Sequence, residues 1–325
     1  MAVQKNTIES MTATEYLRQI LKNDSRTVIT VGRIKDGKSS WAVYGRDGVE
    51  LSPELRPYAI ASITKTITSA LISRAILEHK ISLDDRIDKY LDLPARYYPT
   101  VLELLTHTAG YKSLYNPIET LINILSKPPK LRISRENVLE RLGKIHVPEN
   151  EKPWRYSNFG YAVLGMILEK IYGKTYTELV DEFMLEQGMV NSHISKSPDD
   201  PVHNVDWRAD DANIAAGGVV SNIEDMLIYA KHQLNEDEPY ATTHGVLKEI
   251  AATKSDLIRM DAMGMAWIID KKRNILWHSG GLPTYCSYMG FHKDTNTALV
   301  VLTNLGLLKG NRASILGVKI LEELQ

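Results

Sequence analysis

The sequence predicts an α+β fold, in which an antiparallel sheet flanked by helices forms a mixed α/β domain and a second domain is all helical. Strand-like segments, rich in β-branched and aromatic residues, occur near the two ends of the chain, at residues 27–44 and 264–302. The middle of the chain carries apolar segments typical of buried helices. We therefore expect residues 1–78 and 255–325 to form the sheet domain and residues 79–254 the helical domain, with an active-site cleft between them.

The first elements follow from local patterns. A helix is expected at residues 14–23. Residues 27–34 and 40–44 are strand-like on either side of an Asp-Gly turn, which predicts a hairpin. Residues 60–79 are apolar almost all round, which predicts a buried helix.

The later elements complete both domains. A second apolar helix is expected from residue 158 to residue 172, because Gly173 suits a helix end, and another helix follows Ser221. A last helix begins near residue 313. Before it, strands are predicted at residues 264–270, 274–278, 285–291 and 298–302.

The composition predicts a globular protein without a cofactor. With 39 Lys and Arg against 40 Asp and Glu, the net charge is −1, and no nucleic-acid partner is expected. The single cysteine excludes an intramolecular disulfide, and neither a His-Glu-x-x-His motif nor a Cys/His cluster indicates a metal site. The acidic pairs at residues 84–85, 199–200 and 210–211 are typical of helix starts and turns.

Localisation depends on what the sequence includes. No apolar stretch approaches the roughly 20 residues that a membrane helix needs. Residues 1–10 are polar and lack the apolar core of a secretory signal. As written, the chain is expected in the cytoplasm, and outside it if a signal has been removed. The sequence leaves monomer and dimer equally open.

Ser62 and Lys65 form the first candidate site. No other serine of the chain has a lysine three residues later, and this spacing places both side chains on one face of the predicted buried helix. A desolvated lysine has a lowered pKa and can act as a base toward a serine hydroxyl. Ser62 also lies at the helix start, where backbone N–H groups favour negative charge. Alternatively, Lys65 extends to solvent and Ser62 is an ordinary helix residue.

Tyr156 and Asn158 form the second candidate, just before the predicted helix at residues 158–172. A phenol close to Lys65 is expected to lose its proton more readily, so Tyr156 serves as base toward Ser62 or as acid toward a leaving group. Asn158 then donates its amide to a substrate carbonyl or to Lys65. The alternative is that Asn158 caps the helix and Tyr156 packs in the core.

The third candidate is the run from His278 to Gly281, which is expected to follow one strand and precede the next. Two glycines after a strand allow a ligand to approach the backbone and leave an N–H free to bind an oxyanion. A tight turn explains the glycines equally well, and His278 then lies in the core or at the surface. The α/β-hydrolase alternative is unsupported, because no Gly-x-Ser-x-Gly occurs.

The order of these motifs, Ser-x-x-Lys, Tyr-x-Asn and His-x-Gly, resembles that of the penicillin-recognising serine hydrolases. The branch that the chain is most similar to contains class C β-lactamases, D-alanyl-D-alanine carboxypeptidases and β-lactamase-like esterases. Connecting segments support the resemblance: residues 104–110 (Leu-Leu-Thr-His-Thr-Ala-Gly), 156–165, 216–218 with Asp225, and 302–304. The resemblance covers about residues 27–325 and implies a β-lactamase/transpeptidase-like fold.

The resemblance also implies a role for each matching residue. Ser62 would be the acylated nucleophile, and Lys65 and Tyr156 would together act as general base and general acid. Asn158 would hold the substrate amide. The backbone N–H groups of Ser62 and Gly281 would form the oxyanion hole. No cofactor or metal is implied.

Departures from the family pattern bear on the substrate. His278, Ser279 and Gly280 replace the Lys-Thr-Gly of efficient β-lactamases, as in peptidases and esterases of the group. We therefore expect a serine hydrolase that acts through an acyl-serine on small esters or D-amino-acid peptides, with β-lactams as inhibitors. The alternatives are a class C-like β-lactamase and a catalytically weak penicillin-binding or sensor protein. Residues 111–147 carry no readable motif and are expected to shape the pocket rim.

Overall fold

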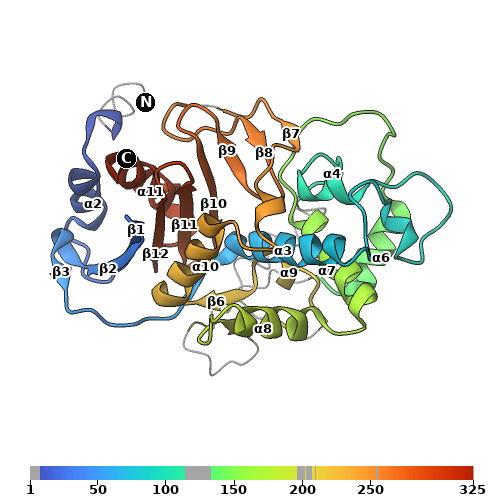
Figure 1. The fold of residues 1–325 in the computed structure, drawn as a ribbon, viewed down its shortest axis with the longest axis horizontal. Helices are drawn as coiled ribbons and strands as arrows, with labels where there is room; N and C mark the ends of the chain where they lie inside the picture. The colour runs from blue at the N-terminus through green and yellow to red at the C-terminus, as the bar shows by residue number, and fades with distance from the viewer. Residues whose placement is uncertain are drawn as a thin grey trace.

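The two ends of the chain meet in one antiparallel sheet in the computed structural model, which describes residues 8–113, 133–195, 202, 207–208, 210–253 and 255–324. Within these residues the sheet has nine strands in the order β3-β2-β1-β12-β11-β10-β9-β8-β7. The N-terminal hairpin joins the C-terminal strands through the β1–β12 pair (Figure 1). The strands are β1 Ile29–Lys35, β2 Lys38–Tyr44, β3 Glu50–Leu51, β7 Lys248–Glu249, β8 Ala262–Met263, β9 Ile268–Asp270, β10 Ile275–Gly281, β11 Cys286–His292 and β12 Thr297–Thr303.

Helices cover both faces of this sheet. Because side chains alternate along a strand, Leu299 and Val301 of β12 pack with the terminal helices, whereas Val300 and Leu302 pack in the larger core with α10. The terminal helices are α2 (Ala13–Leu21) and α11 (Arg312–Leu324), and α10 spans Ile223–Asn235. The sheet is therefore the middle layer of three, and the fold class predicted from the sequence is confirmed.

The other helices group away from α2 in Figure 1. Among them α3 is buried on all sides from Thr64 to Ser73, as its apolar sequence predicts, and only its last turn reaches the surface. A small sheet of order β4-β6-β5 lies in this part of the chain. The elements are α3 Thr64–Leu77, α4 Val101–Leu105, α6 Arg135–Lys144, α7 Asn158–Tyr172, α8 Tyr176–Glu186, α9 Ile214–Gly217, β4 Tyr58–Ala59, β5 His193–Ile194 and β6 Val219–Ser221, with short 3-10 helices at Arg46–Gly48, Ala61–Ile63, Ile87–Lys89, Ala241–Thr243 and Leu307–Lys309.

Three element predictions need correction. The strand expected at residues 264–270 is reduced to β9 at Ile268–Asp270, because residues 264–267 form the turn between β8 and β9, with a φ of +66° at Ala266 and a hydrogen bond from Gly264 N–H to the Trp267 carbonyl. The buried helix begins at Thr64 rather than residue 60, after a 3-10 turn. Gly280 and Gly281 lie inside β10 instead of following a strand.

Some predictions concern parts of the chain that the structure does not test. Of residues 111–147, the stretch 114–132 lies outside the described residues, as do residues 199–200 and 1–7. The domain boundaries stay a prediction. No helix within the described ranges is long and apolar enough to cross a membrane.

Candidate active site

Ser62 lies in the 3-10 turn Ala61–Ile63 that leads into α3, and its side chain is half-buried. The preceding residue, Ala61, has a φ of +49°, a left-handed conformation that costs an L-residue about 1 kcal/mol. Contacts from two sides fix this turn: Ile60 N–H donates to the Val219 carbonyl (3.0 Å), and Ser287 Oγ donates to the Ile60 carbonyl (2.7 Å). The surrounding strands thus hold the turn in place.

Lys65, on the first turn of α3, is fully buried. Its Nζ donates to Asn158 Oδ1 (2.8 Å) and to the backbone carbonyl of Ala216 (2.6 Å), and it lies 3.2 Å from Ser62 Oγ. Burial lowers the pKa of the amine well below its usual range. The hydroxyl and the amine therefore meet as the sequence predicts, and Lys65 does not reach solvent.

Tyr156 lies beside this pair, with Lys65 Nζ 5.0 Å from the centre of its ring. Its phenol shares a hydrogen bond with the Ser62 side chain. Burial raises the pKa of the phenol, and the bond to Ser62 offsets only part of that effect. The expectation that this phenol loses its proton more readily is therefore wrong for the free protein, because a desolvated phenolate is less stable than the neutral group.

Asn158 is the first residue of α7, and the helix is capped by Ser157, whose Oγ accepts from Gly160 N–H (3.0 Å). The amide oxygen of Asn158 accepts from Lys65, so the expected direction of that bond is reversed. Its amide group keeps two N–H donors for another partner. Capping thus falls to the neighbouring serine, and Asn158 contacts Lys65.

His278 in β10 is buried, and its Nδ1 lies 2.8 Å from the backbone carbonyl of Ser279. A carbonyl only accepts, so Nδ1 carries the proton and Nε2 is a bare acceptor. Within the described residues Nε2 has no partner. Burial, with a smaller effect from Lys65, lowers the pKa of the imidazole to about 3. His278 is therefore a neutral hydrogen-bond acceptor at pH 7.

Gly280 allows β10 to approach the serine turn. A Cβ at this position would lie 2.2 Å from the Ile60 carbonyl oxygen and 2.4 Å from Ser287 Oγ, which no side chain tolerates. Only glycine fits between the strand and the turn. The glycine thus serves contact between protein segments rather than a turn.

One cavity of about 330 Å³ brings the predicted site residues together. No Asp, Glu, Lys or Arg occurs among the described residues that line it, and Lys65 lies behind Ser62. Nor do the described parts of the chain contain a group of three or more His, Cys, Asp or Glu that could hold a metal ion. The predicted residues in the lining are Ser62, Tyr156, Asn158, His278, Ser279, Gly280 and Gly281.

His107 is a site residue that the sequence analysis quoted but gave no role. Its carbonyl accepts from Arg155 N–H (2.8 Å) and its Nδ1 accepts from Ser157 N–H (3.2 Å), so it fixes both neighbours of Tyr156. The centres of the His107 and Tyr156 rings lie 4.6 Å apart. Burial, then Lys65 and His278, lower the pKa of His107 well below its usual range. His107 lies in the segment at residues 104–110, which supports the family resemblance, but no local sequence pattern indicates what this residue does.

Comparison with known proteins decides the family. A sequence model of the family named Beta-lactamase matches residues 13–315, which is nearly the whole chain. The chain belongs to the Beta-lactamase family. The resemblance inferred from three short motifs is thereby confirmed.

The curated relatives of this chain differ widely from it in sequence and length. A probable fimbrial assembly protein FimD of Dichelobacter nodosus is 35% identical over 133 residues, 39% of this chain and 32% of that protein. Protein flp of Staphylococcus aureus (strain COL) is 25% identical over 294 residues, 81% of this chain and 56% of that protein. The chain thus spans about a third to a half of the length of these relatives.

A solved structure shares the fold at low identity. The β-lactamase/D-alanine carboxypeptidase from Yersinia pestis, complexed with citrate, superposes with a TM-score of 0.76 at 19% identity and covers 99% of both chains. At this identity the similarity establishes the fold alone. Substrate and activity must be argued from the site.

Proposed function

We propose that this protein is a serine hydrolase that forms an acyl-enzyme at Ser62 and acts on small esters or D-amino-acid peptides, with uncharged esters the better substrates. The observation that carries the proposal is the set of partners around Lys65. Two of them, the Asn158 amide oxygen and the Ala216 carbonyl, can only accept hydrogen bonds. A neutral amine has two N–H groups and one lone pair, so the lone pair is left for the Ser62 hydroxyl, 3.2 Å away.

Acylation then follows from this arrangement. Ser62 Oγ attacks the substrate carbonyl carbon as its proton moves to Lys65 Nζ. The carbonyl electrons move onto oxygen, and the oxyanion is bound by the backbone N–H groups of Ser62 and Gly281. When the tetrahedral intermediate collapses, the bond from the carbonyl carbon to the leaving oxygen or nitrogen breaks. Water later attacks the acyl-serine, and the acid product leaves while Ser62 regains its proton.

Tyr156 is proposed as the acid for the leaving group. Burial keeps its phenol protonated, and its hydrogen bond to Ser62 places it next to the bond that breaks. The proton that Lys65 accepts from Ser62 later restores the phenol. The free amide N–H groups of Asn158 are proposed to hold a substrate carbonyl.

Substrate charge follows from the electrostatics of the cavity. The described lining has no charged side chain, and the buried imidazole of His278 is neutral with an accepting nitrogen. An anionic substrate would leave its water shell without meeting a full positive charge, and a carboxylate next to a bare imidazole nitrogen is repelled. Penicillins and peptides with a free carboxylate should therefore react more slowly than neutral esters, so β-lactams are proposed as weak inhibitors.

The test is intact-mass analysis and turnover with four probes: a fluorophosphonate, p-nitrophenyl acetate, a D-alanyl dipeptide and a penicillin. We expect one fluorophosphonate adduct per chain, ester turnover, and slower reaction of the two anionic substrates. Ser62→Ala should abolish the adduct and reduce ester turnover by several orders of magnitude with the circular dichroism unchanged. Full activity in that variant would refute the mechanism. Faster turnover of penicillin than of the ester would replace it with the β-lactamase alternative.

A further inference from the structure

A second, larger cavity lies beside the cavity of about 330 Å³ that Ser62 lines, which we call the catalytic cavity. It has a volume of about 1030 Å³, in the range of sites that bind drug-sized ligands. We call it the side cavity. It shares three lining residues with the catalytic cavity, namely Ile258, Met260 and Asn311, so the two spaces meet at one wall. A substrate bound at Ser62 can therefore extend past this wall.

The lining of the side cavity is mostly apolar. Besides the shared wall it includes aliphatic side chains from three distant parts of the chain and the indole of Trp154. The indole Nε1 of Trp154 is buried and has no partner within the described residues. The apolar members that the argument uses are Trp154, Ile250, Leu257, Ile258, Met260 and Ile315.

The charged residues at this cavity are all paired with one another or with neighbours. Glu151 pairs with Lys248, and Lys152 pairs with Glu103 at 2.6 Å. Glu249 pairs with Lys271 on the far side of its strand. Since an ion-paired side chain has its charge already compensated, the described lining gives no unpaired charge to attract an ionic ligand.

We propose that the side cavity binds an apolar arm of the substrate, an alkyl or aryl chain attached to the ester whose carbonyl reaches Ser62. This assignment rests on the proposed hydrolase function and narrows its substrate class. A short acetyl ester is accommodated by the catalytic cavity of about 330 Å³ alone, whereas a chain of eight carbons can extend past the shared wall into the side cavity.

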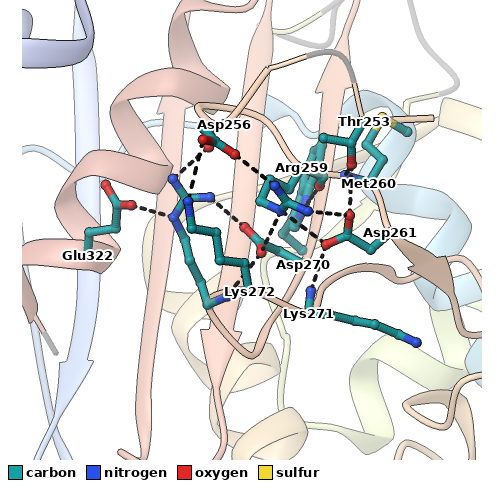
Figure 2. A network of polar contacts seen from close by, with 11 residues as sticks. Thr253, Asp256, Arg259, Met260, Asp261, Asp270, Lys271, Lys272 and Glu322 are labelled. Atoms are coloured by element: carbon teal, nitrogen blue, oxygen red, sulfur yellow. Dashed lines mark hydrogen bonds and ion pairs between the residues drawn. The ribbon is translucent and has the colours of Figure 1, made fainter. Parts of the chain in front are cut away.

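A polar network holds the shared wall in position. The wall segment, residues 255–261, carries both Ile258 and Met260. Between them, Arg259 turns away and binds Asp261 through two nitrogens (2.9 and 3.2 Å) and Asp256 through a third (2.7 Å), as Figure 2 shows. Asp270 of β9 lies 3.7 Å from the same guanidinium. Arg259 is therefore a positioning residue, because its bonds fix the backbone that carries Ile258 and Met260, and these two side chains line both cavities.

Further bonds tie the wall segment to the sheet. Trp277 Nε1 in β10 donates to the Arg259 carbonyl (3.1 Å), and Met260 N–H donates to Thr253 Oγ1 (2.7 Å). Lys271 N–H donates to Asp261 (3.0 Å), also drawn in Figure 2. The wall is thus anchored to the same strand that carries His278, so its distance from the catalytic residues is fixed.

The test compares p-nitrophenyl esters of two, four and eight carbons, together with ethyl and octyl acetate, which place the chain on the leaving side. Each buried methylene improves kcat/KM by about fourfold. We expect octanoate, octyl acetate or both to exceed the shorter ester by more than about tenfold. Equal kcat/KM along both series would overturn the assignment, while hydrolysis of acetate would leave the proposed function standing.

Substituted variants distinguish loss of binding of the substrate chain from a general effect on folding. Leu257→Glu should remove the chain-length preference and change p-nitrophenyl acetate hydrolysis by less than about threefold, because Leu257 lines the side cavity and not the catalytic one. Leu185→Glu, at an exposed position of α8, is the matched control and should keep the preference. Arg259→Ala should raise KM for octanoate more than KM for acetate, with Arg259→Lys restoring part of the loss. A preference that survives Leu257→Glu would overturn the proposal.

A binding measurement covers the case in which no ester is turned over. Calorimetric titration with 1-octanol should show saturable binding to the wild-type protein and to Leu185→Glu, and at least tenfold weaker binding to Leu257→Glu. Binding in the absence of turnover would support the side cavity and contradict the hydrolase. Absence of octanol binding together with equal ester rates would contradict the side cavity alone.

Discussion

Acid is expected to destabilise this protein through His278. Burial, and to a smaller extent Lys65, lowers the pKa of this imidazole from its ordinary value of 6.5 to about 3. The unfolded chain therefore binds a proton at pH values where the folded protein does not. Because stability rises with pH wherever the unfolded state binds more protons, stability should fall as the pH falls from about 6.5 toward 3.

The size of the effect follows from the two pKa values. Each pH unit inside this window costs about 1.4 kcal/mol for one imidazole. Between about pH 7 and about pH 4.5, the loss from His278 amounts to about 2.5 kcal/mol. His244, whose pKa burial lowers to about 4, adds a similar amount, and His107 shifts in the same direction.

The assay is urea unfolding followed by circular dichroism at about pH 7 and about pH 4.5. His278→Gln lacks the titrating group and should lose about 2.5 kcal/mol less than the wild-type protein over this interval. His79→Asn, at an exposed left-handed position that asparagine tolerates, should lose as much as the wild type. If His278→Gln and the wild type lose the same free energy of unfolding, the buried neutral state of His278 is refuted.

Two further predictions concern the groups around Ser62. Lys65→Ala and Tyr156→Phe should each reduce kcat by orders of magnitude, and the double variant should be little worse than either, because both move one proton; a product of the two defects would show independent roles. His107→Ala should lower kcat/KM by about tenfold, the loss of one hydrogen bond, since it frees the neighbours of Tyr156. His107→Asn keeps an acceptor and should recover part of the rate; equal rates in the two variants would show that this bond does not position Tyr156.

Local structure was predictable where a single signal decides it. The helix from Asn158 to Tyr172 has the expected bounds, because Gly173 adopts the left-handed conformation (φ +65°) that ends a helix. The contact between Ser62 and Lys65 also follows from helical spacing alone. What spacing cannot supply is the approach of Tyr156 and His278 from other elements, for which the sequence offered only a family resemblance.

Properties that depend on burial were beyond the sequence. The shift of the Tyr156 pKa has the opposite sign to the expected one, because desolvation outweighs the neighbouring groups. For Gly280 the sequence left close approach of a ligand and a tight turn equally open, yet the reason for glycine is the Ile60 carbonyl, which comes from a segment more than 200 residues away. The side cavity likewise has no local pattern, since Ile8, Trp154, Ile250 and Ile315 meet only in the fold.

The neutral surroundings of Lys65 link the proposed mechanism to the charge of the proposed substrate. In the proposed mechanism Lys65 can act as a base because burial lowers its pKa, and its hydrogen-bond partners among the described residues are neutral oxygens rather than carboxylates. The same low-polarity surroundings keep Tyr156 protonated and His278 neutral. A charged substrate entering this cavity would shift all three pKa values, and an anion would hold the proton on Lys65 and remove the base. A site tuned in this way favours a substrate that is neutral at the carbonyl and apolar beyond it, and the side cavity is built to receive such a substrate.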